Sequence, residues 1–178
     1  MNIKLIALLG LVSLSSLTNA ADGEITFTGK VLDTTCTLGG TDGDYTVTLP
    51  TVGKTALSTA GATAGDTTFN IELTSCPVTT GISAFFDNTI TEVLSSGRLK
   101  NTATVGAAVN VDVELLNVDG EPLKLQLGTA SEQLSTTVAN PTADGDVTLG
   151  FKARYYATAP VTTGGEVASR AVYTIIYE

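Results

Sequence analysis

The sequence predicts an all-β fold of the immunoglobulin-like sandwich type, and three observations support this prediction. Short segments alternate apolar and polar residues, which is the period-2 pattern of a strand with one buried face. Turn residues separate these segments roughly every ten positions, as in small β-sandwiches. Thr, Gly, Val and Ala dominate the composition while Trp and His are absent, which favours strands over helices.

The first twenty residues have the pattern of a secretory signal peptide. Lys4 gives a positive start, residues 5–17 form an apolar run diluted by serines, and small residues precede a cleavage point after Ala20 or, alternatively, Ala21. The apolar run is shorter than the about 20 residues that a membrane span needs. Removal of residues 1–20 would leave 158 residues, the size of one domain with its own core.

The eight predicted strands follow one another along a single domain. The first runs from Gly23 to Val31 and on toward Cys36, with Gly23, Ile25, Phe27, Gly29 and Val31 on one face and polar residues between them. The others are Tyr45–Leu49, Phe69–Leu73, Ser83–Asp87, Val109–Leu115, Leu123–Leu127, Val147–Tyr156 and Ala171–Glu178.

Turn residues set the limits of these strands. Gly39–Asp44 is rich in glycine and aspartate, Pro50 stops the second strand, and Gly145 lies in the turn before Val147. Asp119-Gly120 predicts a hairpin that joins the strands on either side of it.

The two cysteines, Cys36 and Cys76, are expected to form one disulfide, because exported chains meet oxidising conditions. On the chain-entropy model, closing this loop would stabilise the fold by about 4 kcal/mol. A metal site usually needs more than two cysteines when no histidine is present, and a redox pair usually has the spacing Cys-x-x-Cys. Asp42 and Asp44 begin like a calcium loop, but the remaining ligands are missing, so no metal or cofactor is predicted.

The chain is acidic, with 18 acidic and 9 basic residues and a net charge of −9. This charge disfavours nucleic acid and anionic membranes as partners, since both attract basic surfaces. An enzyme is also disfavoured, because no histidine is available as a general base. Asp112 and Glu114 share one strand face and are interpreted as solubilising exterior residues, and Lys152 and Arg154 are likewise expected on a solvated face.

The two ends of the chain predict an incomplete sandwich. The last strand ends with Tyr177 and Glu178, so the C-terminal strand that would cover its edge is missing, while a spare strand stands at the N-terminus. From the alternation alone, Gly23–Val31 could pair within its own domain or with another chain, and the last strand could be an ordinary edge strand.

These features resemble the pilus subunits of the chaperone–usher class, similar to the rod and adaptor pilins of type 1 and P pili. The matching segments span the mature chain: residues 21–31, the cysteine pair, Phe69–Leu73 and Phe151–Thr158. The C-terminal motif also matches, with Gly165 as the fourteenth residue from the end and Tyr177 as the penultimate one.

The resemblance implies that residues 1–20 are the signal peptide, 21–32 a donor-strand extension and 33–178 the pilin domain. A donor strand from another subunit would complete the sandwich through Gly23, Ile25, Phe27, Gly29 and Val31. The acceptor groove and C-terminal motif would comprise Gly165, Ala171, Tyr173, Ile175 and Tyr177.

The partners implied are a periplasmic chaperone, an outer-membrane usher, and identical or homologous pilin subunits in a heterologous polymer that does not close. The product would be an extracellular fimbrium on the bacterial surface, reached through the periplasm.

Length and the Phe151–Thr158 stretch resemble a major rod subunit, whereas the N-terminal Ala-Asp-x-x-Ile-Thr pattern also fits a minor adaptor near the fimbrial tip. A secreted sugar-binding module is disfavoured because aromatic platforms are scarce.

Overall fold

The computed structural model describes residues 25–77, 81–133, 135 and 139–177. The predicted signal peptide and Gly23 lie outside the described residues. The chain divides into two units, residues 1–32 and 33–178. In the first unit, residues 25–32 form neither strand nor helix. No helix in the described part of the chain is long and apolar enough to cross a membrane.

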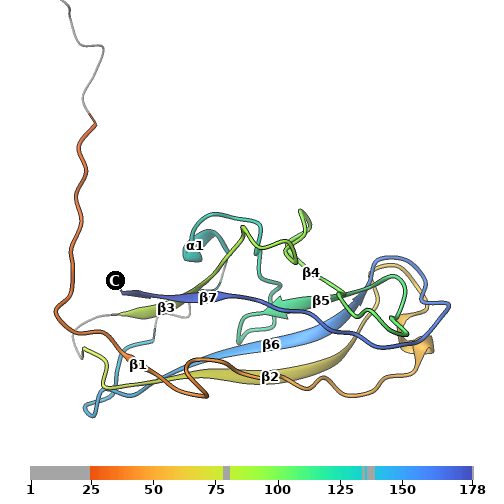
Figure 1. The fold of residues 1–178 in the computed structure, drawn as a ribbon, viewed down its shortest axis with the longest axis horizontal. Coiled ribbons are helices and arrows are strands. Elements are labelled where there is room, and N and C mark those ends of the chain that lie inside the picture. Colours follow the sequence, from red (N-terminus) through yellow and green to blue (C-terminus); the bar gives the residue numbers. More distant parts are fainter. Residues whose placement is uncertain (1–24, 78–80, 134, 136–138, 178) are drawn as a thin grey trace, which may run out of the picture. The chain divides into compact units, whose positions relative to one another are not determined.

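The second unit is built from antiparallel strands, as Figure 1 shows. The larger sheet has the strand order β1-β2-β6-β5-β4, and β3 pairs with β7 in a second sheet. The strands are β1 (Thr37–Leu38), β2 (Thr63–Thr74), β3 (Ile82–Phe86), β4 (Leu99–Lys100), β5 (Val111–Leu116), β6 (Val147–Ala157) and β7 (Tyr173–Tyr177). Two short helical segments, η1 (Lys54–Leu57) and α1 (Ala130–Gln133), accompany them. The all-β prediction is confirmed.

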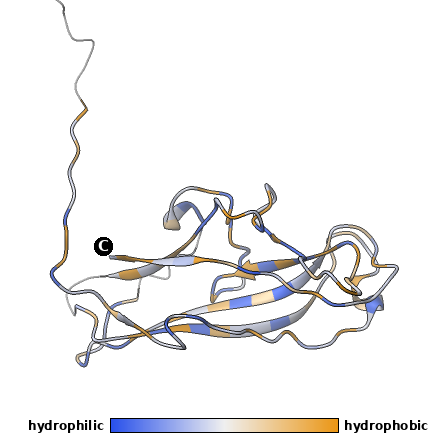
Figure 2. Cartoon of the chain, viewed as in Figure 1, coloured by the Kyte–Doolittle hydropathy of each residue, from blue (hydrophilic) through white to orange (hydrophobic). Residues whose placement is uncertain are grey.

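The core lies between the two sheets. β2 and β6 pair in a register that places Phe69 opposite Phe151, and the ring centroids of these two residues lie 5.7 Å apart. Phe86 of β3 meets the Phe151 ring edge-on at 5.2 Å, which joins the second sheet to the first. Figure 2 shows hydrophobic and hydrophilic residues alternating along the long strands, as the sequence predicted.

The predicted disulfide between Cys36 and Cys76 is present. Cys36 precedes β1 and Cys76 follows β2, and Thr37 is paired with Thr74 beside the bond. The covalent link therefore fixes the beginning of the second unit to one end of the larger sheet.

The predicted first strand is not a strand over its described residues 25–31, and two predicted strands of the second unit are not strands either. Tyr45, Val47 and Leu49 are half-buried and alternate with exposed threonines, yet residues 45–49 have no ladder partner. Residues 123–127 divide their hydrogen bonds: the Leu123 N–H donates to β5 and the Lys124 N–H donates to Gln133. Periodicity predicts which face of a segment is buried, but a ladder also needs a continuous neighbouring backbone.

Gln133 fastens α1 to the edge of β3. Its side chain is fully buried, its Oε1 accepts from the Phe86 N–H at 3.0 Å, and its Nε2 donates to the Phe86 carbonyl at 2.7 Å. The same Nε2 also lies 3.1 and 3.0 Å from the carbonyl oxygens of Leu125 and Leu127. One side chain thus satisfies backbone groups of two segments that no ladder joins.

We expect Gln133→Ala to lower the free energy of unfolding by about 3 kcal/mol, because it leaves several buried backbone groups without their hydrogen-bond partner. Gln126→Ala is the matched control, since that side chain is exposed, and it should change stability by less than about 0.5 kcal/mol. Urea denaturation followed by far-UV circular dichroism measures both. Equal stability of the two variants would contradict the role given to Gln133.

Candidate functional site

An apolar groove of about 1420 Å³ runs along the second unit between residues 42–54 and residues 164–177. Its floor comes from the inner faces of both sheets, including Phe69 and Ile71 of β2, Phe86 of β3, and Val113 of β5. The apolar floor suits an occupant with apolar side chains on one face, while the walls carry charged residues of both signs.

One wall of the groove is β7, which pairs along only one edge in the described part of the chain. β3 covers that edge from Phe86↔Tyr173 to Ile82↔Tyr177. Ala171, Tyr173, Ile175 and Tyr177 are half-buried and line the groove, whereas the residues between them are exposed. In an antiparallel strand, backbone N–H and C=O groups point alternately to the two edges, so β7 offers half of its groups to whatever occupies the groove.

Two tyrosine hydroxyls join β7 to the beginning of the unit. The Tyr177 hydroxyl accepts a hydrogen bond from the Cys36 N–H at 2.9 Å, and the Tyr173 hydroxyl donates to the Gly43 carbonyl at 2.7 Å. Burial raises the pKa of Tyr173, with smaller contributions from Tyr45 and Asp44. The Tyr173 hydroxyl therefore stays protonated, and the two hydrogen bonds tie β7 to residues 36–43.

Gly165 lies at the other end of the groove, where its backbone packs against residues 106–108. The Glu166 N–H donates to the Gly106 carbonyl at 2.8 Å, and the Ala108 N–H donates to the Glu166 carbonyl at 2.9 Å. A Cβ on Gly165 would overlap the Gly106 carbonyl oxygen and lie 2.7 Å from the Ala108 nitrogen. Only glycine fits this approach, which fixes where the wall that leads to β7 begins.

The predicted donor residues lie in the first unit, apart from Gly23, which is not described. Ile25, Phe27 and Val31 are 79, 89 and 95 % exposed, and a Cβ added to Gly29 would have no other atom within 4 Å. Such exposure of three large apolar side chains in one short segment is unusual for a finished soluble domain.

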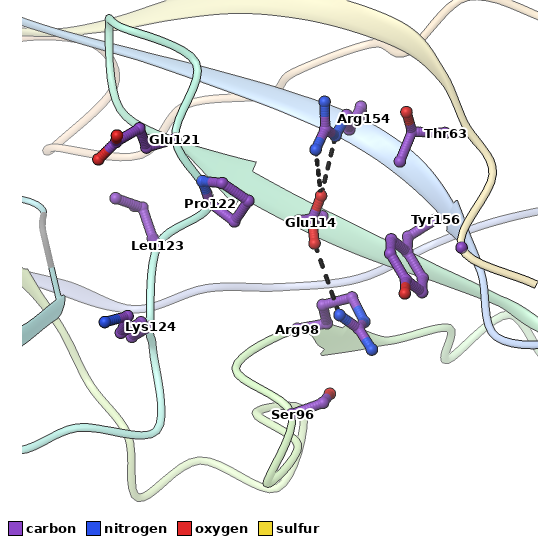
Figure 3. A pocket seen from close by; sticks show the side chains of 11 residues that line it. Thr63, Ser96, Arg98, Glu114, Glu121, Pro122, Leu123, Lys124, Arg154 and Tyr156 are labelled. Carbon is purple, nitrogen blue, oxygen red and sulfur yellow. Dashed lines mark hydrogen bonds and ion pairs between the residues drawn. The ribbon is translucent and has the colours of Figure 1, made fainter.

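A second pocket of about 630 Å³ is polar and holds charged residues that the sequence interpretation placed wrongly (Figure 3). Asp112 and Glu114, expected on the exterior, are only 8 and 4 % exposed. The residues lining the pocket include Arg98, Tyr156 and residues 121–124, which cover the outward face of β5. Polar residues therefore alternate with apolar ones along β5 although both faces of the strand are covered, because the polar face is buried as ion pairs.

Glu114 is the centre of this ion-pair cluster. Arg154 donates to its Oε2 through Nε at 2.9 Å and Nη2 at 2.7 Å, so Arg154 is not the solvated residue that the sequence suggested. Arg98 lies 3.5 Å from Glu114 and 3.8 Å from Asp112, and its guanidinium stacks 3.7 Å from the Tyr156 ring centroid. Burial raises the pKa of Asp112, and the Arg98 charge opposes that shift.

The described residues contain no group of three or more His, Cys, Asp or Glu side chains able to hold a metal ion. In the second pocket, Glu114 is paired with Arg98 and Arg154. The apolar groove is therefore the feature of this unit that best fits a macromolecular occupant.

Comparison with known proteins agrees with this geometry. Residues 49–178 match the sequence profile of a family described as Type-1 fimbrial protein, A. The chain is 44 % identical to the Major fimbrial subunit SMF-1 of Stenotrophomonas maltophilia, over 89 % of this chain and 94 % of that protein. It is 42 % identical to the F17 fimbrial protein of Escherichia coli, with 92 % of each chain covered.

Solved structures place the fold in the same group. The P pilus rod subunit PapA superposes with a TM-score of 0.53 at 18 % identity, covering 80 % of this chain and 99 % of that one. A Burkholderia pseudomallei antigen and type I fimbria protein gives a TM-score of 0.53 at 29 % identity, covering 82 and 91 %. These likenesses confirm the predicted incomplete immunoglobulin-like fold.

We expect Gly165→Ala to lower the free energy of unfolding by about 1–3 kcal/mol, the usual cost of forcing an atom into a filled space. Gly164→Ala is the control, because nothing lies within 4 Å of a Cβ there. Thermal unfolding of the two variants tests the close approach. A Gly165→Ala protein as stable as Gly164→Ala would show that residues 106–108 move aside at no cost.

We expect Glu114→Gln to destabilise the protein by about 2–3 kcal/mol, since it removes the buried charged partner of Arg154 and leaves it only the exposed Asp66 at 3.7 Å. Glu92→Gln is the comparison, because its partner Arg170 is 65 % exposed, and the loss there should be much smaller. Chemical denaturation at neutral pH gives both values. Similar losses would mean that burial adds nothing to the Glu114 pair.

Proposed function

The chain belongs to the Type-1 fimbrial protein, A family and is a structural subunit of a surface fimbrium, and we propose that it polymerises by accepting a strand from a second copy of itself. The observation that carries this proposal is the groove beside β7. β7 has one covered edge, its inward residues line an apolar groove, and the exposed segment 25–31 alternates with the matching period. A strand added to an exposed sheet edge gains ladder hydrogen bonds and side-chain burial together.

The direction of the added strand follows from the sandwich. Immunoglobulin-like sheets are antiparallel, so the occupant should run antiparallel to β7. β7 leads from the Gly165 end of the groove to the Cys36 end, where Tyr177 meets Cys36. The occupant must therefore enter with Val31 at the Gly165 end.

This direction requires a second molecule as the donor. Residues Ala171–Tyr177 span about 20 Å as a strand, so Val31 must lie at least that far from the Cys36 end. Four residues separate Val31 from Cys36 in its own chain, and the five Cα–Cα steps between them reach at most about 17 Å. The segment cannot therefore fill its own groove antiparallel, whereas the segment of another copy can.

The energetics agree with this assignment. Burial of Ile25, Phe27 and Val31, which are almost fully exposed, would contribute roughly 1.5–3 kcal/mol for each side chain. Gly23 and Gly29 would let the donor backbone lie close to the groove floor. Because the strand given and the groove offered are different surfaces, the contact is heterologous and the polymer stays open.

The subunit is proposed to be the major rod subunit. Its high identity to the major subunit SMF-1 and the family profile support this choice. A minor adaptor is the alternative, supported by 33 % identity to the Minor fimbrial subunit HifD of Haemophilus influenzae. The relatives are structural fimbrial subunits, and we propose no enzymatic activity for this chain.

We also propose that a periplasmic chaperone occupies the groove before assembly and that an outer-membrane usher exchanges it for the donor segment. The open edge of β7 supports a temporary partner, because an unpaired strand bordering an apolar groove promotes aggregation. The route to the surface fimbrium would then pass through the periplasm.

We expect Phe27→Arg to abolish polymers while leaving the groove able to bind chaperone, because a buried charge would oppose insertion of the donor. Thr28→Arg is the matched control, since Thr28 lies on the opposite face of the alternating segment and should still polymerise. Electron microscopy of cells and co-purification with the chaperone give the two readouts. Filaments of normal length from Phe27→Arg would refute the donor role.

A further inference from the structure

We propose that the end of the domain beside Gly165 is a contact surface for the body of the donating copy, and that the part of that copy which meets it is the acidic end around its Cys36. This inference rests on the proposed strand exchange and adds a second contact, outside the groove. The surface is formed by residues 53–64, 101–110 and 157–168 and is called the neutral end below. Hydrogen bonds join these three segments, namely Gly61 N–H to the Ala157 carbonyl at 2.8 Å, Thr158 N–H to Asn110 at 2.9 Å, and Glu166 N–H to Gly106 at 2.8 Å.

The neutral end is unusually poor in charge for an acidic chain. Lys54 and Glu166 are the charged residues in its three segments, and their charges cancel. The two most exposed large apolar side chains described in residues 33–177 lie there, Val105 at 81 % and Val109 at 52 %. Exposed valines on a surface without net charge favour a contact with another molecule over a solvated face.

The opposite end of the domain is acidic. No Lys or Arg occurs in residues 33–44 or 139–147. These two segments carry five exposed aspartates near the disulfide, namely Asp33, Asp42, Asp44, Asp144 and Asp146. Two hydrogen bonds place the turns that carry four of them at this end, from Cys76 N–H to the Gly145 carbonyl at 2.8 Å and from Gly39 N–H to the Glu72 carbonyl at 2.8 Å, close to the end of β2. Two acidic ends would repel each other, whereas a neutral end can approach an acidic one.

Chain geometry brings these two ends together. With the donor antiparallel to β7, its Val31 lies at the Gly165 end, and Gly165 itself touches residues 106–108. Cys36, where the donating copy's domain is anchored, follows Val31 by five residues, which reach at most about 17 Å. The acidic end of the donating copy must therefore lie against or close to the neutral end of the accepting copy.

The test changes the sign of a charge at one exposed position. Val105→Asp should make the polymer lose subunits at least tenfold faster than wild type, because it sets a negative charge against the acidic end. Val105→Lys should dissociate at the wild-type rate or more slowly, and the difference between the two should shrink in 1 M salt, where the screening length falls to about 3 Å. Val118→Asp is the control at a partly exposed valine outside the neutral end.

A second measurement separates this contact from strand exchange itself. A synthetic peptide of residues 21–33 is added to full-length Phe27→Arg subunits, with and without Val105→Asp, and should bind both within twofold. A peptide that binds neither would refute the proposed function. Peptide binding together with unchanged polymer dissociation for Val105→Asp would overturn the contact surface, and equal acceleration by Asp and Lys would overturn the acidic end as its partner.

Discussion

The edge of β7 that faces the groove is the constraint on which the rest of this structure depends. A strand paired on one side needs a second backbone, and the residues across the groove do not supply it: Tyr45, Val47 and Leu49 bury their side chains without forming a ladder. The two tyrosine hydroxyls and the Gly165 contact hold the ends of the groove instead.

The fold was largely predictable because its strands bury one face. Phe69–Leu73 and Val147–Tyr156 alternate clearly and lie opposite each other in β2 and β6. The disulfide was predictable because only two cysteines exist in an exported chain. The close approach of Gly165 to residues 106–108 was not, since a glycine in sequence does not say which backbone it touches.

The errors of the sequence interpretation have a common physical origin. Asp112 and Glu114 were placed outside because polar residues at alternate positions usually face water, but here Arg98 and Arg154 neutralise them beneath a covering segment. Residues 123–127 were taken for a strand because they alternate, but Gln133 and β5 share their hydrogen bonds. In each case the deciding contact is made by a residue outside the alternating segment, and Arg154 lies 40 positions from Glu114.

The position of the Cys36–Cys76 bond has a mechanical consequence. If the subunits assemble through donor segments, as proposed, tension would enter each domain through residues 32–35 and reach Cys36 first. The disulfide passes that pull directly to the end of β2, and the Tyr177 hydroxyl ties the same point to β7. Both sheets would thus bear the force together. The domain would therefore resist unfolding from its first residue.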